Sequence, residues 1–342
     1  MNPKTFKIVV VALVLSVLAM LAVLAALIAG AVMWFNFKAA NDRHAAADAF
    51  YVQKEWDKAI DGYTEIIRRN PKDARAYVGR GCAYEWKGQT DMAISDYTEA
   101  LRLDPGNSYT YGNRGHAYVT KGELDRAIRD EDQAIRLDPQ IAANYVFRGF
   151  AYSRQGELDK AASDYAEAIR LDPANGAAYG GRGYMYSLQG QWTNVIDDYS
   201  EAIRLNPEDG NALVARAYAY VHQDDCEKAI SDYKEAIRLM PGSPRPYNDL
   251  AWLLATSSVI TVRDGKEAVA LAKKACELDA WKHSASIDTL AAAFAEAGDF
   301  TEAIKYQKEA LSMTDVTDKY RAEGQQRLSL YQQGKPYRET PK

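Results

Sequence analysis

The 34 residues ARAYVGRGCAYEWKGQTDMAISDYTEALRLDPGN, from Ala74 to Asn107, decide the fold. Their pattern returns in each following block up to Ser243, without insertion or deletion. Prolines that recur every 34 residues mark the period: Pro71, Pro105, Pro139, Pro173, Pro207 and Pro241. Self-similarity at one fixed period of this length predicts a repeat architecture.

Each block is expected to form a helical hairpin. Apolar residues follow three- and four-residue spacing from Ala74 to Lys87 and from Asp91 to Leu103, and Lys87-Gly88-Gln89 separates the two runs. Proline then ends the second helix, because it lacks an amide donor and restricts the preceding residue. One hairpin cannot bury its apolar face alone, so the hairpins must stack.

Small and aromatic residues recur with the same step, as at Gly81, Tyr84, Ala93 and Tyr97. This arrangement resembles the tetratricopeptide-repeat (TPR) family. The resemblance implies an all-α, right-handed superhelical solenoid of about eight helical hairpins. The expected units lie near 40–73, 74–107, 108–141, 142–175, 176–209, 210–243, 244–283 and 284–315, and a capping helix over 316–334 and a tail over 335–342 follow them.

Some units depart from the family pattern. The first unit has Lys54 where a turn glycine is expected, and the third has Glu131 in place of its second aromatic residue. The seventh carries an insertion around 256–265 and Ala280 in place of proline.

The N-terminal region predicts a membrane anchor. After a short tail over residues 1–7, Ile8 to Trp34 contains no charged residue. As a helix this run would be about 40 Å long, enough to cross a hydrocarbon core of roughly 30 Å, and the predicted transmembrane helix covers 8–35. A cleavable signal peptide is the alternative, although its apolar region would be shorter. The slight excess of positive charge before the span favours a single-pass protein with its repeats outside the cytoplasm.

Composition argues against several function classes. The chain carries a net charge of −5, which disfavours a nucleic-acid partner. Its four histidines and three cysteines show no metal-ligand spacing, and no nucleophile or phosphate-loop motif occurs. We therefore expect no catalytic residue, metal or cofactor, and a protein that is not an enzyme.

Arginines and aspartates also follow the repeat. The arginines are Arg80, Arg114, Arg148, Arg182 and Arg216, and the aspartates are Asp96, Asp130, Asp164, Asp198 and Asp232. A partly buried arginine needs a partner, so these residues predict a ladder of ion pairs between the two helices of each hairpin. A charged binding stripe is the alternative interpretation.

The TPR resemblance also implies a concave groove, lined in the family by five positions of each first helix. At one of these positions four consecutive units carry an aromatic ring. The predicted partner-binding groove comprises Trp86, Tyr109, His116, Phe150, Tyr184, Tyr218, Arg245 and Trp252. These rings could instead pack only against neighbouring helices, but exposed aromatic rows usually mark partner sites. The lysine and asparagine of the family's chaperone-carboxylate clamp are missing, since Val78 and Cys82 stand in their places.

We therefore expect a membrane-anchored scaffold that binds a protein or peptide partner in this groove without catalysis. The alternative is a noncatalytic carbohydrate-binding module of the cell envelope, because aromatic rows also stack on sugar rings.

Overall fold

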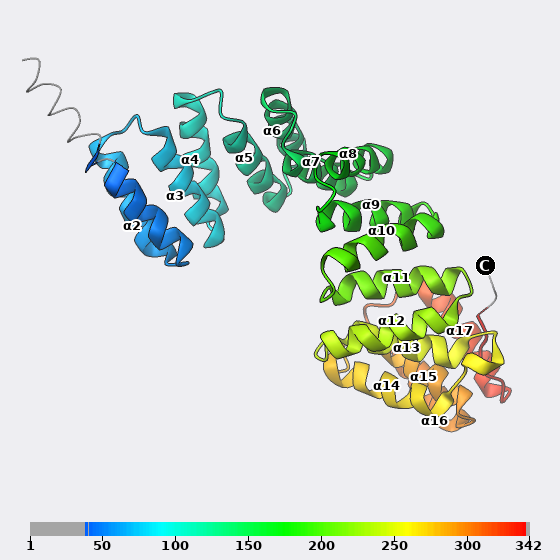
Figure 1. Cartoon of the computed structure of the whole chain (residues 1–342). Helices are drawn as coiled ribbons and strands as arrows, with labels where there is room; N and C mark the ends of the chain where they lie inside the picture. The colour runs from blue at the N-terminus through cyan, green and yellow to red at the C-terminus, as the bar shows by residue number, and fades with distance from the viewer. Residues whose placement is uncertain (1–37, 40, 340–342) are drawn as a thin grey trace, which may run out of the picture. The chain divides into compact units, whose positions relative to one another are not determined.

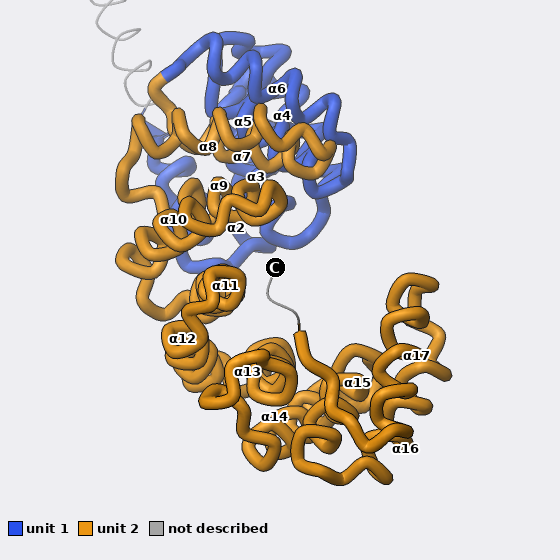
Figure 2. The backbone as a smooth tube through the Cα atoms, turned by 90° about the vertical axis from the view of Figure 1, so that its right-hand side faces the viewer, with its two compact units in different colours: residues 1–139 blue, residues 140–342 orange. Residues whose placement is uncertain are grey.

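The computed structural model describes residues 38–39 and 41–339. The described residues form helices and loops without a β-strand (Figure 1). The chain divides into two compact units, one up to Pro139 and one from Gln140 (Figure 2). The tail over 1–7, the transmembrane prediction over 8–35 and residues 340–342 lie outside the described residues.

Unit 1 is a stack of helical hairpins, in which each helix packs against its neighbours along the chain. Its elements are a helix over residues 41–52, α2 (Trp56–Arg69), α3 (Ala74–Trp86), α4 (Thr90–Leu103), α5 (Ser108–Lys121) and α6 (Leu124–Leu137). The core consists of small residues from one helix and rings from the next. Gly81, for example, lies against Tyr97, which is fully buried.

Unit 2 continues the same helical repeat. Its elements are α7 (Ala142–Gln155), α8 (Leu158–Leu171), α9 (Gly176–Leu188), α10 (Trp192–Leu205), α11 (Gly210–His222), α12 (Cys226–Leu239), α13 (Pro244–Thr256), the 3-10 helix η1 (Ile260–Val262), α14 (Gly265–Leu278), α15 (Ser284–Glu296), α16 (Phe300–Ser312) and α17 (Asp318–Gln332). The insertion of the seventh unit thus forms a loop with η1. Its end is fixed where the Asp264 amide donates to the Leu254 carbonyl at 3.1 Å.

The turns between helices need left-handed backbone, which explains the recurring glycines. Gly122 and Gly156 have φ of 78° and 80°. Lys54, which replaces the first turn glycine, adopts φ of 59° despite its side chain. The period therefore dictates the turn geometry even where the sequence departs from glycine.

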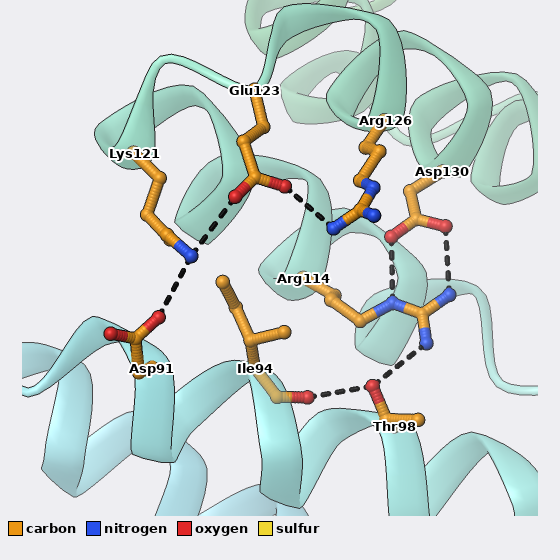
Figure 3. A network of polar contacts seen from close by, with 8 residues as sticks. All are labelled: Asp91, Ile94, Thr98, Arg114, Lys121, Glu123, Arg126 and Asp130. Carbon is orange, nitrogen blue, oxygen red and sulfur yellow. Dashed lines mark hydrogen bonds and ion pairs between the residues drawn. The ribbon is translucent and has the colours of Figure 1, made fainter.

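The predicted ion-pair ladder is confirmed. In unit 1, Arg114 of α5 donates to both carboxylate oxygens of Asp130 on α6, at 2.7 and 2.9 Å (Figure 3). The same guanidinium donates to the Thr98 hydroxyl of α4 at 3.1 Å, so one side chain joins three consecutive helices. Equivalent pairs link the remaining four arginines to their aspartates. Because the aspartates are buried, the ladder is structural rather than a binding stripe.

Candidate functional site

The sequence sets the register of the first helices in unit 2 through their caps. The Asn175 side chain accepts a hydrogen bond from the Ala178 amide at 3.1 Å and begins α9. Asp209 accepts from the Ala212 amide at 3.1 Å and begins α11, and α13 begins with Pro244. Residues 34 positions apart therefore occupy the same place on successive first helices.

Glycines separate the packed face of α9 from its open face. A Cβ at Gly181 would lie 2.5 Å from the Tyr165 ring, so this side of the helix fits closely against α8. A Cβ at Gly180 would meet nothing within 4 Å. Within this segment of α9, Gly181 and Gly183 thus allow close packing against neighbouring helices, and the adjacent Tyr184 is 52% exposed.

Two adjoining pockets lie along the open faces of the first helices of unit 2. One has a volume of about 690 Å³ and is lined by Tyr184, Tyr218 and Arg245. The other has a volume of about 460 Å³ and is lined by Tyr218, Arg245 and Trp252. The shared residues make the two pockets one continuous site, which we call the aromatic groove and define by Tyr184, Tyr218, Arg245 and Trp252.

Tyr218 is the central ring of this groove. The residue is 46% exposed, and its ring meets His222 edge-on, with centroids 4.5 Å apart. Trp192 stacks on His222 at 4.0 Å and also touches Tyr218 edge-on at 5.8 Å. These contacts hold the ring in place while leaving about half of it open, so it is preorganised for a ligand.

The other predicted site residues lie elsewhere. Phe150 is exposed on α7 beneath the Arg154 guanidinium, which is 5.9 Å from its ring centroid, and it lines neither pocket. Three residues belong to unit 1: Trp86, Tyr109 and His116.

In unit 1 these residues have separate surroundings. Trp86 stacks on Trp56 at 5.6 Å and donates from Nε1 to the Tyr51 hydroxyl at 2.8 Å. His116 Nδ1 contacts the Glu85 carboxylate, which raises the pKa of the imidazole mainly through their hydrogen bond. Tyr109 is 66% exposed.

Polar groups missed by the sequence analysis also line the aromatic groove. Asp249 Oδ2 lies 3.5 Å from Arg245 Nε. Burial raises the pKa of the Asp249 carboxyl, although the arginine opposes the shift. The groove is therefore richer in polar groups than its repeat positions indicate. Asp249 precedes a buried leucine on α13, and nothing in the repeat pattern distinguishes it from a surface carboxylate.

A buried arginine of α17 is another of these groups. Arg327 is 4% exposed and forms an ion pair with Asp288 of α15, with Nη2–Oδ2 and Nε–Oδ1 distances of 3.0 and 3.1 Å. Its guanidinium also lies 5.6 Å from the centroid of Trp252. The last helix thus packs on α16 and forms one wall of the smaller pocket.

Acidic groups outnumber cationic ones in the smaller pocket. Its carboxylates are Asp224, Asp249, Asp288, Glu323 and Glu339, and its arginines are Arg245 and Arg327. The rings and this charge balance fit a ligand that has both apolar and cationic groups.

Comparisons with known proteins assign the chain to a family. Models described as tetratricopeptide repeat match residues 45–73, 74–107, 96–129, 142–175, 189–244 and 284–314. These matches together cover more than half of the sequence, and the hairpin structure agrees with them. The chain belongs to the tetratricopeptide-repeat proteins, a fold class whose members generally serve as noncatalytic scaffolds.

The chain is also similar to individual proteins of this class. It is 37% identical over 51 residues to the Hsp70-Hsp90 organizing protein 1 of Glycine max, and the match spans 15% of this chain and 9% of that protein. The solved structure of Pseudomonas aeruginosa pilF matches with a TM-score of 0.57 and 15% identity, covering 62% of this chain and 96% of that one. The C-terminal part of a TPR repeat-containing protein from Cytophaga hutchinsonii matches with a TM-score of 0.56 and 20% identity. This match covers 72% of this chain and 99% of that one. At these identities the two structures support the fold alone.

Proposed function

We propose that this protein is a scaffold that binds an extended segment of a partner protein in the aromatic groove of unit 2. The single observation that carries the proposal is that Tyr184, Tyr218, Arg245 and Trp252 line two connected pockets. Exposed rings that are held by neighbouring side chains supply contact area at little entropic cost, so they suit protein recognition.

The sequence adds a proposal about location. The uncharged run from Ile8 to Trp34 supports a single membrane-spanning helix over 8–35 that holds the repeats at the outer surface of the membrane. Among the helices of residues 38–39 and 41–339, none has the length and apolar character to cross a bilayer. Retention in carbonate-washed membranes by the full chain, and release of a variant lacking 8–35, would support the anchor. Protease can also be added to intact cells whose outer membrane, if they have one, has been removed. Digestion of the repeats would then support their place outside the cytoplasm.

The groove is tested by crosslinking in intact cells followed by affinity capture of the chain. We expect the amount of partner captured by Tyr184→Ala/Tyr218→Ala to be at least tenfold lower than that captured by the wild type, while the helicity of the variant is unchanged. Tyr179→Ala is the matched control, because this tyrosine is on the same helix but contacts Arg182 of the ladder instead. Equal capture by the wild type and the double variant would refute the groove proposal.

A carbohydrate ligand is the competing proposal, and a thermal-shift measurement on the same double variant tests it. If soluble polysaccharide fragments from the cell envelope raise the thermal midpoint of the wild type but not of Tyr184→Ala/Tyr218→Ala, the groove binds sugar instead of protein.

A further inference from the structure

The chain places its own C-terminal segment against the groove. After α17 the backbone returns along α15 to α13 (Figure 2). The Glu339 amide donates to the Thr256 carbonyl at 2.9 Å, and Arg338 Nη1 donates to the Ala255 carbonyl at 3.3 Å. Both acceptors belong to the last turn of α13, whose carbonyls have no partner within the helix and which is the negative end of its dipole.

Two side chains of this segment occupy chemically distinct places. The Tyr337 ring lies beside both the Trp252 ring, at a centroid distance of 6.0 Å, and the Arg327 guanidinium, at 5.7 Å, which are themselves in contact. The neighbouring Arg338 guanidinium forms an ion pair with Glu296 at the end of α15. One place therefore selects an aromatic ring and the next selects a cation.

The segment lies at the surface of the fold, where the Tyr337 ring also packs against the buried cluster that includes Ala295 and Tyr331. Residues 336–339 are only partly buried, and no helix includes them. Their contacts combine one main-chain hydrogen bond with pockets for adjacent side chains, which is how extended peptides bind to protein surfaces. The remaining groove beyond Glu339 continues toward Tyr218 and Arg245 through the smaller pocket.

We propose that this end of the groove recognises an extended peptide in which an aromatic residue precedes arginine, and that Tyr337-Arg338 occupies the site until such a partner segment displaces it. This inference rests on the proposed function, because it names the chemistry of the segment that the groove takes. The tail competes at the millimolar effective concentration that a short linker gives, so a partner must bind several residues of the groove to replace it.

The test uses the purified full-length chain and a labelled nonapeptide, GKPYRETPK, which copies residues 334–342. We expect Tyr337→Ala/Arg338→Ala, whose own tail has lost both side chains, to bind this peptide at least tenfold more tightly than the wild type by fluorescence anisotropy. Lys335→Ala is the matched tail control and should bind as weakly as the wild type, because the Lys335 ammonium only reaches Gln333, at 3.4 Å. A peptide with alanine at both the tyrosine and the arginine should bind neither protein.

A further substitution, at Glu296, tests whether the peptide arginine binds where Arg338 lies. Adding Glu296→Gln to the double variant should weaken peptide binding at least tenfold, because it removes the charge that meets the arginine. Circular dichroism checks folding, and Arg338→Ala alone replaces the double variant if that variant unfolds. The inference would be overturned if folded Tyr337→Ala/Arg338→Ala did not bind the nonapeptide. It would also be overturned if adding Glu296→Gln left the affinity for the nonapeptide unchanged.

The two proposals fail separately. Partner capture in cells depends on Tyr184 and Tyr218, whereas nonapeptide binding depends on Trp252 and Glu296. Loss of capture by Tyr184→Ala/Tyr218→Ala together with no nonapeptide binding would leave the scaffold function standing and remove only the aromatic-arginine chemistry. If instead the double variant Tyr184→Ala/Tyr218→Ala captured its partner normally and the nonapeptide did bind, the scaffold proposal would fail and the tail-binding site would remain.

Discussion

At the scale of single residues, the ladder arginines stabilise the hairpins because each neutralises a buried carboxylate. Arg182 donates to both oxygens of Asp198 at 2.9 and 2.7 Å, and Asp198 is 4% exposed. Arg182→Leu leaves that carboxylate buried without a cation, so we expect a loss of about 3 kcal/mol in the free energy of unfolding. Urea denaturation followed by circular dichroism measures it.

Two further variants separate charge from side-chain size. Arg170→Leu removes an exposed pair with Glu167 on α8 and should leave the free energy of unfolding almost unchanged, because solvent screens that pair. Arg182→Leu/Asp198→Leu should recover most of the loss, because no buried charge remains. A double variant as unstable as Arg182→Leu would show that packing, and not the unpaired carboxylate, causes the defect.

At the scale of one element, α9 offers neighbouring glycines with opposite roles. Gly180→Ala adds a methyl group into open space within a helix and should raise the stability by about 0.5–1 kcal/mol, because alanine loses less backbone entropy. Gly181→Ala places its Cβ against the buried Tyr165 ring and should lower the stability by about 1–3 kcal/mol. Thermal unfolding of the two variants checks this, and shifts of equal sign would contradict the assignment of the two faces.

The elements themselves could be predicted from sequence because the period controls them locally. Proline and glycine mark the ends of each hairpin, so the expected break at Lys87-Gly88-Gln89 lies between α3 and α4. The exposed rings of Tyr184 and Tyr218 were predictable for the same reason, since a residue repeated every 34 positions returns to the same face. Asp249 and Arg327 were not, because their burial depends on the helices that cover them and not on their own spacing.

At the scale of the whole molecule, the periodic part and the terminal part differ in how they can be predicted. Each repeat unit contacts mainly its neighbours along the chain, so one unit predicts the next. The segment after Ser312 has no repeat partner, and its place in unit 2 depends on the Asp288–Arg327 pair and on Tyr337. The TPR resemblance implied a capping helix there, but it gave no indication that this helix supplies a buried arginine to the groove.

The cap should control stability locally within unit 2. A chain that ends at Val316 loses α17 and leaves Asp288 without Arg327, next to Gln307, whose amide donates to it at 2.5 Å. In a linear stack the loss should spread only to near neighbours, so hydrogen exchange should quicken in α15 and α16 while α7 and α8 keep their protection. A chain that ends at Gly334 keeps α17 and should retain protection in α15 and α16.

Substitution of Asp288 tests directly whether its charge is the reason that α17 is needed. Burial raises the pKa of the Asp288 carboxyl even in the complete chain, so a neutral side chain should be tolerated there once the arginine is gone. Asp288→Asn in the chain ending at Val316 should therefore restore part of the protection in α15, whereas the same substitution in the full chain should lower it by leaving Arg327 unpaired. If Asp288→Asn lowers protection equally in both chains, the aspartate matters for its hydrogen bond to Gln307, and the cap acts through apolar contact instead of through Arg327.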